Sequence, residues 1–285
     1  MKSGFVVLAG RSNVGKSSLL NALVGSKVAI VTPKPQTTRR PVRGILHDPR
    51  GQIVFVDTPG VFLGKKDELS LKLNASVKEQ LEGIDVVVYV TDPTREPGAE
   101  EENIQRILRK LPTPIILAIN KMDLVPEKRP HTDAMRRIDV GQKEVLEVSA
   151  KRRSDLNKLV DSIFSFLPEG EPFYPDLQIT DMAHKEWLQE LIREKVFMRL
   201  EQELPYTVHV EVTDIGERGT SGKFVAATVW TTEDRYKGMI IGAKAAMLKQ
   251  IGIDVRRELE DVTGMKVYLE LTVKVDAKWP QRFTV

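Results

Sequence analysis

The sequence predicts an α/β fold for the first part of the chain, a mostly parallel sheet with helices on both faces, followed by a smaller α+β domain. Apolar runs of strand length alternate with amphipathic segments up to residue 167, a pattern typical of an open parallel sheet. A stretch with three prolines and no basic residue then begins at Pro168. We therefore expect a domain at 1–167, a semi-rigid linker at 168–180 and a second domain at 181–285.

The composition excludes several classes of protein. The 285 residues include no cysteine, so disulfides, thiol catalysis and zinc–thiolate sites are excluded. No apolar stretch approaches the roughly 18 residues that cross a bilayer. The chain enters a strand within its first residues, so we expect no secretory leader. The formal net charge is only +3, and binding to nucleic acid would therefore need a local basic patch.

The elements of the first domain follow from apolar runs and from helical spacing. Continuous apolar runs indicate buried parallel strands, and a P-R-G turn joins the second strand to the third. We expect strands at 5–9, 42–48, 52–56, 84–90, 114–119 and 144–148, and helices at 18–23, 71–81, 100–111 and 155–167.

The first strand leads into a segment, Gly10–Ser17, that reads G-R-S-N-V-G-K-S and precedes a helix. A strand, a glycine-bounded loop and a helix form the context of a phosphate-binding P-loop. The glycines let backbone N–H groups point at phosphate oxygens, and the helix N-terminus favours an anion. Lys16 would reach the β- and γ-phosphates, and Ser17 would hold Mg²⁺. The alternative is a chance glycine turn before an ordinary helix.

A polar loop at 28–43 follows the first helix and contains two adjacent threonines. A threonine in such a loop can bind Mg²⁺ only when the γ-phosphate is present, so the loop would act as a switch. We favour Thr38 as this ligand, with Thr37 as the alternative. A plain basic surface loop is the other interpretation.

The third strand ends in D-T-P-G, which spans Asp57, Thr58, Pro59 and Gly60. An acidic residue at the end of an apolar strand is the second half of a phosphate–Mg²⁺ site, so Asp57 would hold the metal. Glycine at position 60 would let its N–H approach the γ-phosphate. The next residue, Val61, cannot orient the attacking water. Another group therefore positions this water, or hydrolysis is slow without a partner.

The strand at 114–119 delivers N-K-M-D, a sequence that selects guanine. Asp123 can accept hydrogen bonds from both N1–H and the exocyclic amine of guanine, and adenine lacks this pair of donors. Asn120 would tie the strand end to the P-loop, and the stem of Lys121 would stack on the base. After the strand at 144–148, the N–H of Ala150 would contact guanine O6. A surface loop of mixed charge is the alternative for N-K-M-D.

We expect guanine nucleotide to contact the residues of all these motifs. They are Gly10, Arg11, Ser12, Asn13, Val14, Gly15, Lys16, Ser17, Asp57, Thr58, Pro59, Gly60, Val61, Asn120, Lys121, Asp123, Ser149, Ala150 and Lys151. The expected metal ligands are Ser17, Thr38 and Asp57.

The second domain reads as α-β-β-α-α-β, with helices at 186–204, near 236–240 and from 245 to about 262, and strands at 207–213, 223–231 and 266–275. The two later helices meet at I-G-A-K-A, where Gly242 would let an RNA backbone approach. Basic residues outnumber acidic ones here, and Asp254 is the one acid between residues 235 and 257. The expected RNA contacts are Gly242, Ala243, Lys244, Ala245, Lys249, Lys237, Arg256 and Arg257. An ordinary helix–turn–helix with solvated lysines is the alternative.

The first domain resembles the P-loop GTPases, and Val61 together with Asn13 places it near their TrmE–Era group. The second domain resembles a type II KH domain, although Ala245 replaces the second glycine of the usual I-G-x-x-G loop. Together they resemble the Era family of ribosome-assembly GTPases along nearly the whole chain. The resemblance implies GTP or GDP and Mg²⁺ as ligands, with K⁺ beside Asn13. It also implies binding to the 3′ end of 16S rRNA on the 30S subunit, and a monomer that is cytoplasmic or peripheral to the cytoplasmic membrane.

We keep two further functions open. One is an RNA-binding scaffold whose nucleotide pocket is occupied but hydrolyses GTP poorly. The other is an ATP-using P-loop kinase, which Asn120 and Asp123 oppose because they fit guanine.

Overall fold

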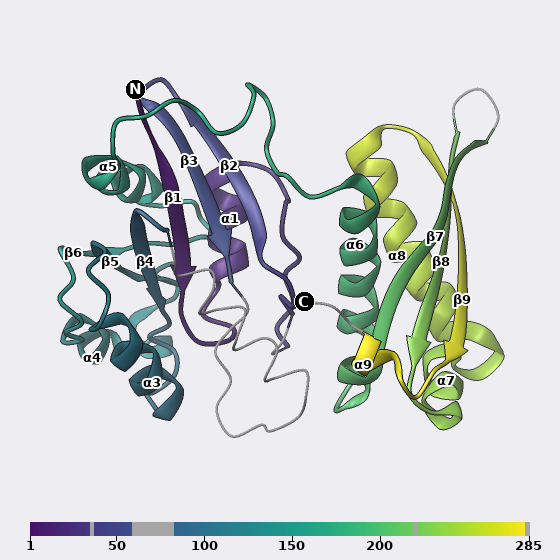
Figure 1. The fold of residues 1–285 in the computed structure, drawn as a ribbon. Coiled ribbons are helices and arrows are strands. Elements are labelled where there is room, and N and C mark those ends of the chain that lie inside the picture. Colours follow the sequence, from purple (N-terminus) through teal and green to yellow (C-terminus); the bar gives the residue numbers. More distant parts are fainter. Residues whose placement is uncertain (35–36, 59–82, 219–221, 283–285) are drawn as a thin grey trace. The chain divides into compact units, whose positions relative to one another are not determined.

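The computed structural model describes residues 1–34, 37–58, 83–218 and 222–282, and the chain divides into two compact units (Figure 1). The first unit comprises Met1–Val31 and Thr38–Asp181. The second comprises Thr32–Thr37 and Met182–Thr284. The short segment 32–37 therefore belongs with the second unit, although it lies inside the first unit along the sequence.

The first unit is built on a six-stranded sheet with the strand order β2-β3-β1-β4-β5-β6 (Figure 1). β2 runs antiparallel to β3, and the other neighbours pair in parallel. β4 and β5 are buried along their whole length, as expected of central parallel strands. The strands are β1 (Lys2–Ala9), β2 (Val42–Asp48), β3 (Gly51–Asp57), β4 (Val86–Thr91), β5 (Ile115–Ile119) and β6 (Glu144–Glu147).

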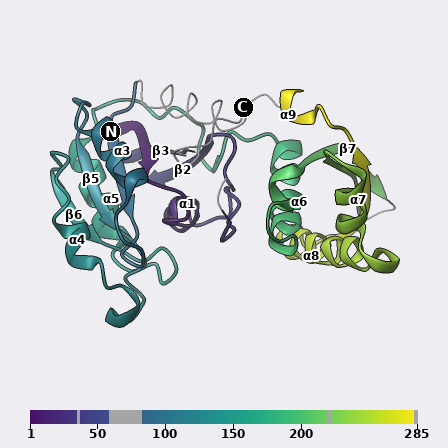
Figure 2. The ribbon, with the colours of Figure 1, turned by 90° about the horizontal axis from the view of Figure 1, so that it is seen from below.

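Helices cover both faces of this sheet. α3 (Ala99–Leu108) and α4 (Thr132–Arg136) pack on one face through a core that includes Ile104 and Met135. α1 (Lys16–Val24) and α5 (Leu156–Phe166) contact the strands from the other face (Figures 1 and 2). The expected α/β class with helices on both faces is confirmed. The helix expected at 71–81 lies outside the described residues.

The proline-rich stretch packs against the first unit. The backbone N–H of Ser3 donates to the carbonyl of Pro168 at 3.1 Å, and the side chain of Gln52 bonds the backbone of Tyr174. These contacts satisfy backbone groups beside β1 and β3. The unit boundary accordingly falls after Asp181, whereas the sequence predicts a linker at 168–180 between the two domains.

The second unit holds a three-stranded sheet, β7-β8-β9, in which β8 pairs antiparallel with β7 and parallel with β9. Alternate residues of each strand share one core with three helices, as period-2 patterning predicts. The order α-β-β-α-α-β is as expected. The elements are α6 (His184–Arg199), β7 (Val208–Arg218), β8 (Gly222–Thr231), α7 (Asp234–Ile241), α8 (Ala246–Thr263) and β9 (Lys266–Val275).

The structure differs from the expected helices at the end of α6 and near the end of the chain. α6 ends at Arg199 because Leu200 is extended, and a separate 3₁₀ turn (Leu204–Thr207) follows with Pro205 in its first turn. Near the end of the chain, a short helix, α9 (Trp279–Arg282), was not expected.

Candidate functional site

The P-loop connects β1 to α1 and depends on glycine at both ends. Gly10 has φ +154° and Gly15 has φ +97°, values that side chains disfavour. A Cβ atom on Gly10 would lie 2.4 Å from the carbonyl oxygen of Val90, and one on Gly15 would lie 2.4 Å from Nδ2 of Asn120. Glycine at these positions therefore lets the loop approach the ends of β4 and β5.

Lys16 is buried, and its ammonium group donates to the carbonyl oxygens of Gly10 at 2.9 Å and Arg11 at 3.0 Å. Burial lowers the pKa of Lys16, and the nearby charge of Asp57 opposes this shift. The ammonium group thus lies inside the curl of the P-loop, where the loop's N–H groups and the start of α1 favour a phosphate.

Three oxygen-bearing side chains meet beside the P-loop. The hydroxyl of Ser17 donates to Oδ2 of Asp57 at 2.5 Å and lies 3.1 Å from the hydroxyl of Thr38, which is 3.3 Å from the same carboxylate oxygen. The other oxygen of Asp57 is buried without a hydrogen-bond partner among the described residues. Burial raises the pKa of Asp57 because its charged form loses hydration. An unpaired carboxylate oxygen beside two hydroxyls suits Mg²⁺, which prefers oxygen ligands.

The two neighbouring threonines have different surroundings. Thr38 joins the Ser17–Asp57 cluster, whereas the hydroxyl of Thr37 bonds that of Thr32 at 2.6 Å. The carbonyl of Thr37 accepts a hydrogen bond of 2.5 Å from Arg193 of α6. Of the two candidates, the structure brings Thr38 alone to the expected metal ligands.

The expected base-binding residues surround a hollow of about 220 Å³. Asn120 is buried and donates to the carbonyl of Val14 at 3.0 Å, and its Oδ1 accepts from the N–H of Ala150 at 3.1 Å. This one side chain therefore joins the P-loop to the loops after β5 and β6. The lining residues are Gly15, Ser18, Asn120, Lys121, Asp123, Leu124, Ala150 and Lys151.

Asp123 is held by Ser149, whose hydroxyl donates to its Oδ1 at 2.7 Å and accepts from the backbone N–H of Arg152 at 3.0 Å. Among the residues that the structure describes, the second oxygen of Asp123 has no hydrogen-bond partner. The Ala150 N–H, which the sequence assigns to guanine O6, donates to Asn120 here. Binding of guanine would therefore require Ala150 to share or exchange this bond.

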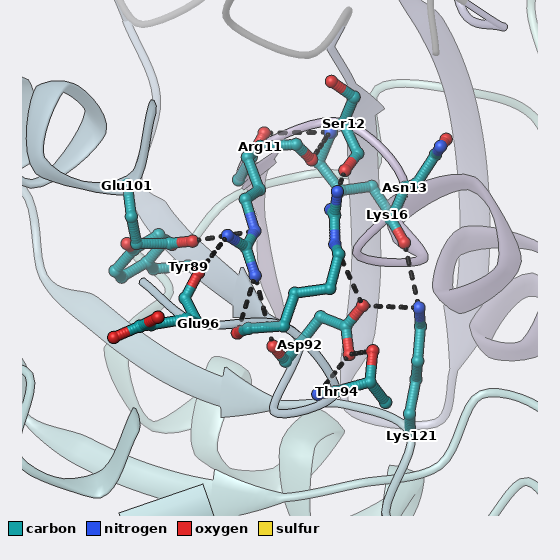
Figure 3. Close-up of polar contacts among 12 residues, drawn as sticks. Arg11, Ser12, Asn13, Lys16, Tyr89, Asp92, Thr94, Glu96, Glu101 and Lys121 are labelled. Atoms are coloured by element: carbon teal, nitrogen blue, oxygen red, sulfur yellow. Dashed lines mark hydrogen bonds and ion pairs between the residues drawn. The ribbon is translucent and has the colours of Figure 1, made fainter. Parts of the chain in front are cut away.

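A polar network next to the P-loop was not predicted from the sequence (Figure 3). Arg11 is buried and pairs with the buried carboxylate of Glu101 on α3 at 3.0 Å, and the hydroxyl of Tyr89 donates to the same carboxylate. Asp92 follows β4 and accepts from Lys121 at 2.5 Å. Two features of the sequence could have indicated this network. Glu101 shares the helical spacing of the apolar residues Ile104 and Leu108, and Asp92 follows a buried strand as Asp57 and Asn120 do.

Of the D-T-P-G segment, the structure describes Asp57 and Thr58. Thr58 is buried and donates to the carbonyl of Leu8 at 3.1 Å. Pro59, Gly60 and Val61 lie outside the described residues.

The expected RNA loop, Gly242–Ala245, lies between α7 and α8. Gly242 ends α7 with φ +71°, and Lys244 and Ala245 have φ of +49° and +60°. Ala243, Lys244 and Ala245 are exposed. Three consecutive residues around the start of α8 are therefore open to a ligand, and two of them adopt the left-handed conformation that glycine favours.

The expected basic residues lie on α7 and α8. Lys249, Arg256 and Arg257 are exposed and Lys237 is half-buried. Asp254 forms an ion pair of 2.6 Å with Arg199 of α6 and so has a partner outside this group.

Comparisons with known proteins find relatives for both units of the chain. Residues 5–121 match the family model described as 50S ribosome-binding GTPase, and residues 203–280 match the KH domain model. The GTPase Era of Heliobacterium modesticaldum is 39% identical, with 99% of this chain and 94% of that protein covered. The GTPase Era of a Thermoanaerobacter strain is 41% identical, with 100% and 94% covered.

Two solved structures are similar along 99% of this chain and 96% of their own, each at 36% identity. One is a variant of Aquifex aeolicus Era bound to GDP and AlF4⁻, with a TM-score of 0.91. The other is Era in complex with MgGDPNP and nucleotides 1506–1542 of 16S ribosomal RNA, with a TM-score of 0.92. The identity and the coverage together show that this chain belongs to the Era family of GTPases.

Proposed function

We propose that this chain binds and hydrolyses GTP through the P-loop site and binds the 3′ end of 16S rRNA through the KH loop, and so assists assembly of the 30S subunit. The observation that carries the proposal is the presence of both sites in one chain. A hollow lined by Asn120, Lys121 and Asp123 adjoins the P-loop, and in the second unit an exposed loop precedes α8, on which Lys249, Arg256 and Arg257 are exposed. The Era structure in complex with MgGDPNP and 16S nucleotides supports the proposal that one chain binds both a guanine nucleotide and this RNA.

Each group at the nucleotide site has a role that its position supports. The N–H groups of the P-loop and the ammonium of Lys16 would hold the phosphates, with Lys16 leaving the carbonyls that it now contacts. Ser17, Thr38 and Asp57 would hold Mg²⁺, which neutralises charge that develops on the phosphates. Thr38 belongs to the loop that follows α1. Its hydroxyl would bind Mg²⁺ only when the γ-phosphate is present, so the loop would change its conformation with the state of the nucleotide.

A multiple-turnover assay of phosphate release, with and without ribosomal RNA, tests hydrolysis. We expect turnover that depends on Mg²⁺ and on Lys16, because both are needed to offset the phosphate charge. An occupied pocket with no release of phosphate in either condition would favour the scaffold function.

We also propose that K⁺ binds beside Asn13 and supplies part of the charge that an arginine finger provides in other GTPases. The support is the asparagine within the P-loop and the valine at position 61. Turnover should be higher in K⁺ than in Na⁺ at equal ionic strength, and Asn13→Ala should remove this difference. Equal rates in the two salts would contradict a K⁺ site.

Salt titration of RNA affinity tests the KH loop, with a GTP analogue bound and an oligonucleotide that matches the 3′ end of 16S rRNA. Lys244→Ala should weaken binding and reduce the salt slope by about one phosphate contact. Lys143→Ala, at an exposed position in the first unit, is the matched control for loss of one positive charge. Gly242 is a poor test position because a Cβ there would lie 2.9 Å from Cβ of Met247.

The family resemblance is the support for three further expectations, namely a monomer, a cytoplasmic location and peripheral contact with the cytoplasmic membrane. Within the described residues, no helix is long and apolar enough to cross a membrane. Light scattering of the purified chain and co-sedimentation with anionic lipid vesicles test the first and third.

A further inference from the structure

We propose that Asp92 is a positioning residue for guanine-nucleotide binding and acts by holding Lys121 at the base site. The inference rests on the proposed function, because it assumes that the N-K-M-D segment binds guanine. It goes beyond the sequence motifs described above, none of which includes Asp92. Figure 3 shows the carboxylate of Asp92 beside the end of the Lys121 side chain.

Both oxygens of the Asp92 carboxylate, which is inaccessible to solvent, have partners. Oδ2 accepts from the ammonium of Lys121 at 2.5 Å, and Oδ1 accepts from the backbone N–H and the hydroxyl of Thr94 at 2.9 and 2.7 Å. The two bonds from Thr94 fix the carboxylate plane, so Oδ2 points at Lys121. Burial by itself would raise the pKa of Asp92, but the hydrogen bonds from Lys121 and Thr94 outweigh it, and the pKa is lowered.

Lys121 is held from two sides. Its ammonium donates to Asp92 and also to the carbonyl of Asn13 in the P-loop at 3.1 Å. The backbone of Lys121 has φ +64°, and its side chain lines the hollow expected to receive the base. A lysine side chain ordinarily samples many rotamers, and fixing it before the nucleotide arrives removes an entropic cost of binding.

The loop after β4 also holds the P-loop directly. Arg95 donates to the carbonyl of Ser12 at 2.7 Å, and Arg11 donates to the carbonyls of Glu96 at 2.9 Å and Arg95 at 3.1 Å. Lys121 contacts Asn13. Three consecutive P-loop residues, Arg11, Ser12 and Asn13, therefore contact either the loop after β4 or Lys121. Asp92 therefore lies where the phosphate-binding loop and the base-reading loop are joined.

Asp92→Asn tests the inference because it keeps the size of the side chain and removes its charge. GDP should dissociate about tenfold faster, since a hydrogen bond between charged groups is lost. The KM for GTP should rise by a similar factor, while kcat at saturating GTP should stay within about twofold of the parent. Asp48→Asn is the matched control, because it makes the same change in the ion pair between Asp48, at the end of β2, and Arg50 in the turn that follows. It should leave GDP dissociation unchanged.

A double-mutant cycle shows whether Asp92 acts through Lys121. Lys121→Met keeps the stem that would stack on the base and removes the ammonium. In that background, Asp92→Asn should not accelerate dissociation further. An undiminished effect of Asp92→Asn with Lys121→Met, or parent-like dissociation of Asp92→Asn alone, would overturn the inference.

Two further variants complete the experiment. If Asp92→Asn does not fold, Thr94→Val removes one hydrogen bond to Asp92 and should accelerate dissociation about threefold. Parent-like dissociation of Thr94→Val would then overturn the inference. Asp123→Asn separates this inference from the proposed function. If Asp123→Asn binds GDP as tightly as the parent, the guanine site itself is wrong, whereas a loss there with no effect at Asp92 rejects only the positioning role.

Discussion

At the residue scale, the nucleotide site contains two buried ionisable side chains, Lys16 and Asp57, which do not fully neutralise each other. Burial lowers the pKa of Lys16 and raises that of Asp57, because the charged form of each loses hydration. One oxygen of Asp57 also lacks a hydrogen-bond partner among the described residues. A phosphate beside Lys16 and a cation beside Asp57 would compensate these charges, so nucleotide and Mg²⁺ should bind together.

Asp123→Asn should change which base the site accepts. Asparagine cannot accept from both guanine donors, so GTP affinity should fall about a hundredfold. Affinity for xanthosine triphosphate should rise, because xanthine presents a carbonyl where guanine has its amine. Competition binding with both nucleotides measures the switch. GTP affinity equal to that of the parent would show that Asp123 does not read the base.

Thr38→Ala should weaken binding of a GTP analogue at low Mg²⁺ by about tenfold and leave GDP binding nearly unchanged. The reason is that the Thr38 hydroxyl meets Ser17 and Asp57, the other expected metal ligands. Thr37→Ala is the matched control, because the Thr37 hydroxyl bonds Thr32 instead. Affinity is measured as a function of Mg²⁺ concentration. A larger loss from Thr37→Ala than from Thr38→Ala would reverse the assignment of the two threonines.

At the element scale, the start of α8 carries backbone strain. Ala245 is the N-cap of this helix and has φ +60° and ψ +23°, the left-handed conformation, which costs about 1 kcal/mol or more for a residue with a Cβ. Its neighbour Lys244 adopts the same region. Strain of this kind occurs often at ligand-binding loops, and the exposed position of this loop agrees with its proposed contact with RNA.

Ala245→Gly should stabilise the second unit by about 0.5–1 kcal/mol, because glycine adopts the left-handed region without steric cost. In a regular helical position the same change would destabilise the protein by up to about 1 kcal/mol. Ala243→Gly is the control, because Ala243 does not have a positive φ and should gain nothing. Urea unfolding of the full chain measures the change. Destabilisation of the protein by Ala245→Gly would contradict the claim that the backbone of Ala245 is strained.

The same substitution should also tighten RNA binding, because it removes a methyl group from the loop that would approach the RNA backbone. The affinity of Ala245→Gly for the 16S oligonucleotide measures this effect.

At the scale of the whole molecule, nucleotide and RNA would bind different units. GDP at about a hundred times its Kd should stabilise the first unit by about 2.7 kcal/mol, because it binds only the folded state. Calorimetry of the full chain should therefore show two unfolding transitions. GDP should raise the midpoint temperature of one of them, that of the first unit, and leave the other unchanged. An equal shift of all transitions would mean that the two units unfold as one.

The segment Thr32–Thr37 complicates this division. It belongs to the second unit, where the ammonium of Lys34 donates to the carbonyls of Phe197 and Leu200 near the end of α6. Thr38, the next residue, belongs to the first unit with Ser17 and Asp57. Thr37 and Thr38 are thus neighbours in the sequence that belong to different units.

The sequence by itself determined the strands, most of the helices and the order of the motifs, because these depend on local patterns. A buried parallel strand such as β5 shows as a continuous apolar run, and the P-loop needs its glycines and its lysine in one short segment. The α-β-β-α-α-β order of the second unit was also predictable from period-2 alternation and helical spacing. The family membership follows from the same motifs.

Only the tertiary structure decided which distant residues meet. The pairs Asp92–Lys121 and Arg11–Glu101 join residues far apart in the sequence, and no local pattern shows which buried acid faces which cation. The packing of residues 168–181 on the first unit depends on partners such as Gln52 in β3. The left-handed backbone of Ala245 could not be predicted from the sequence, because alanine disfavours this conformation. Each of these features depends on side chains and backbone groups brought together by the folded chain, and a buried polar group takes whichever partner the fold supplies.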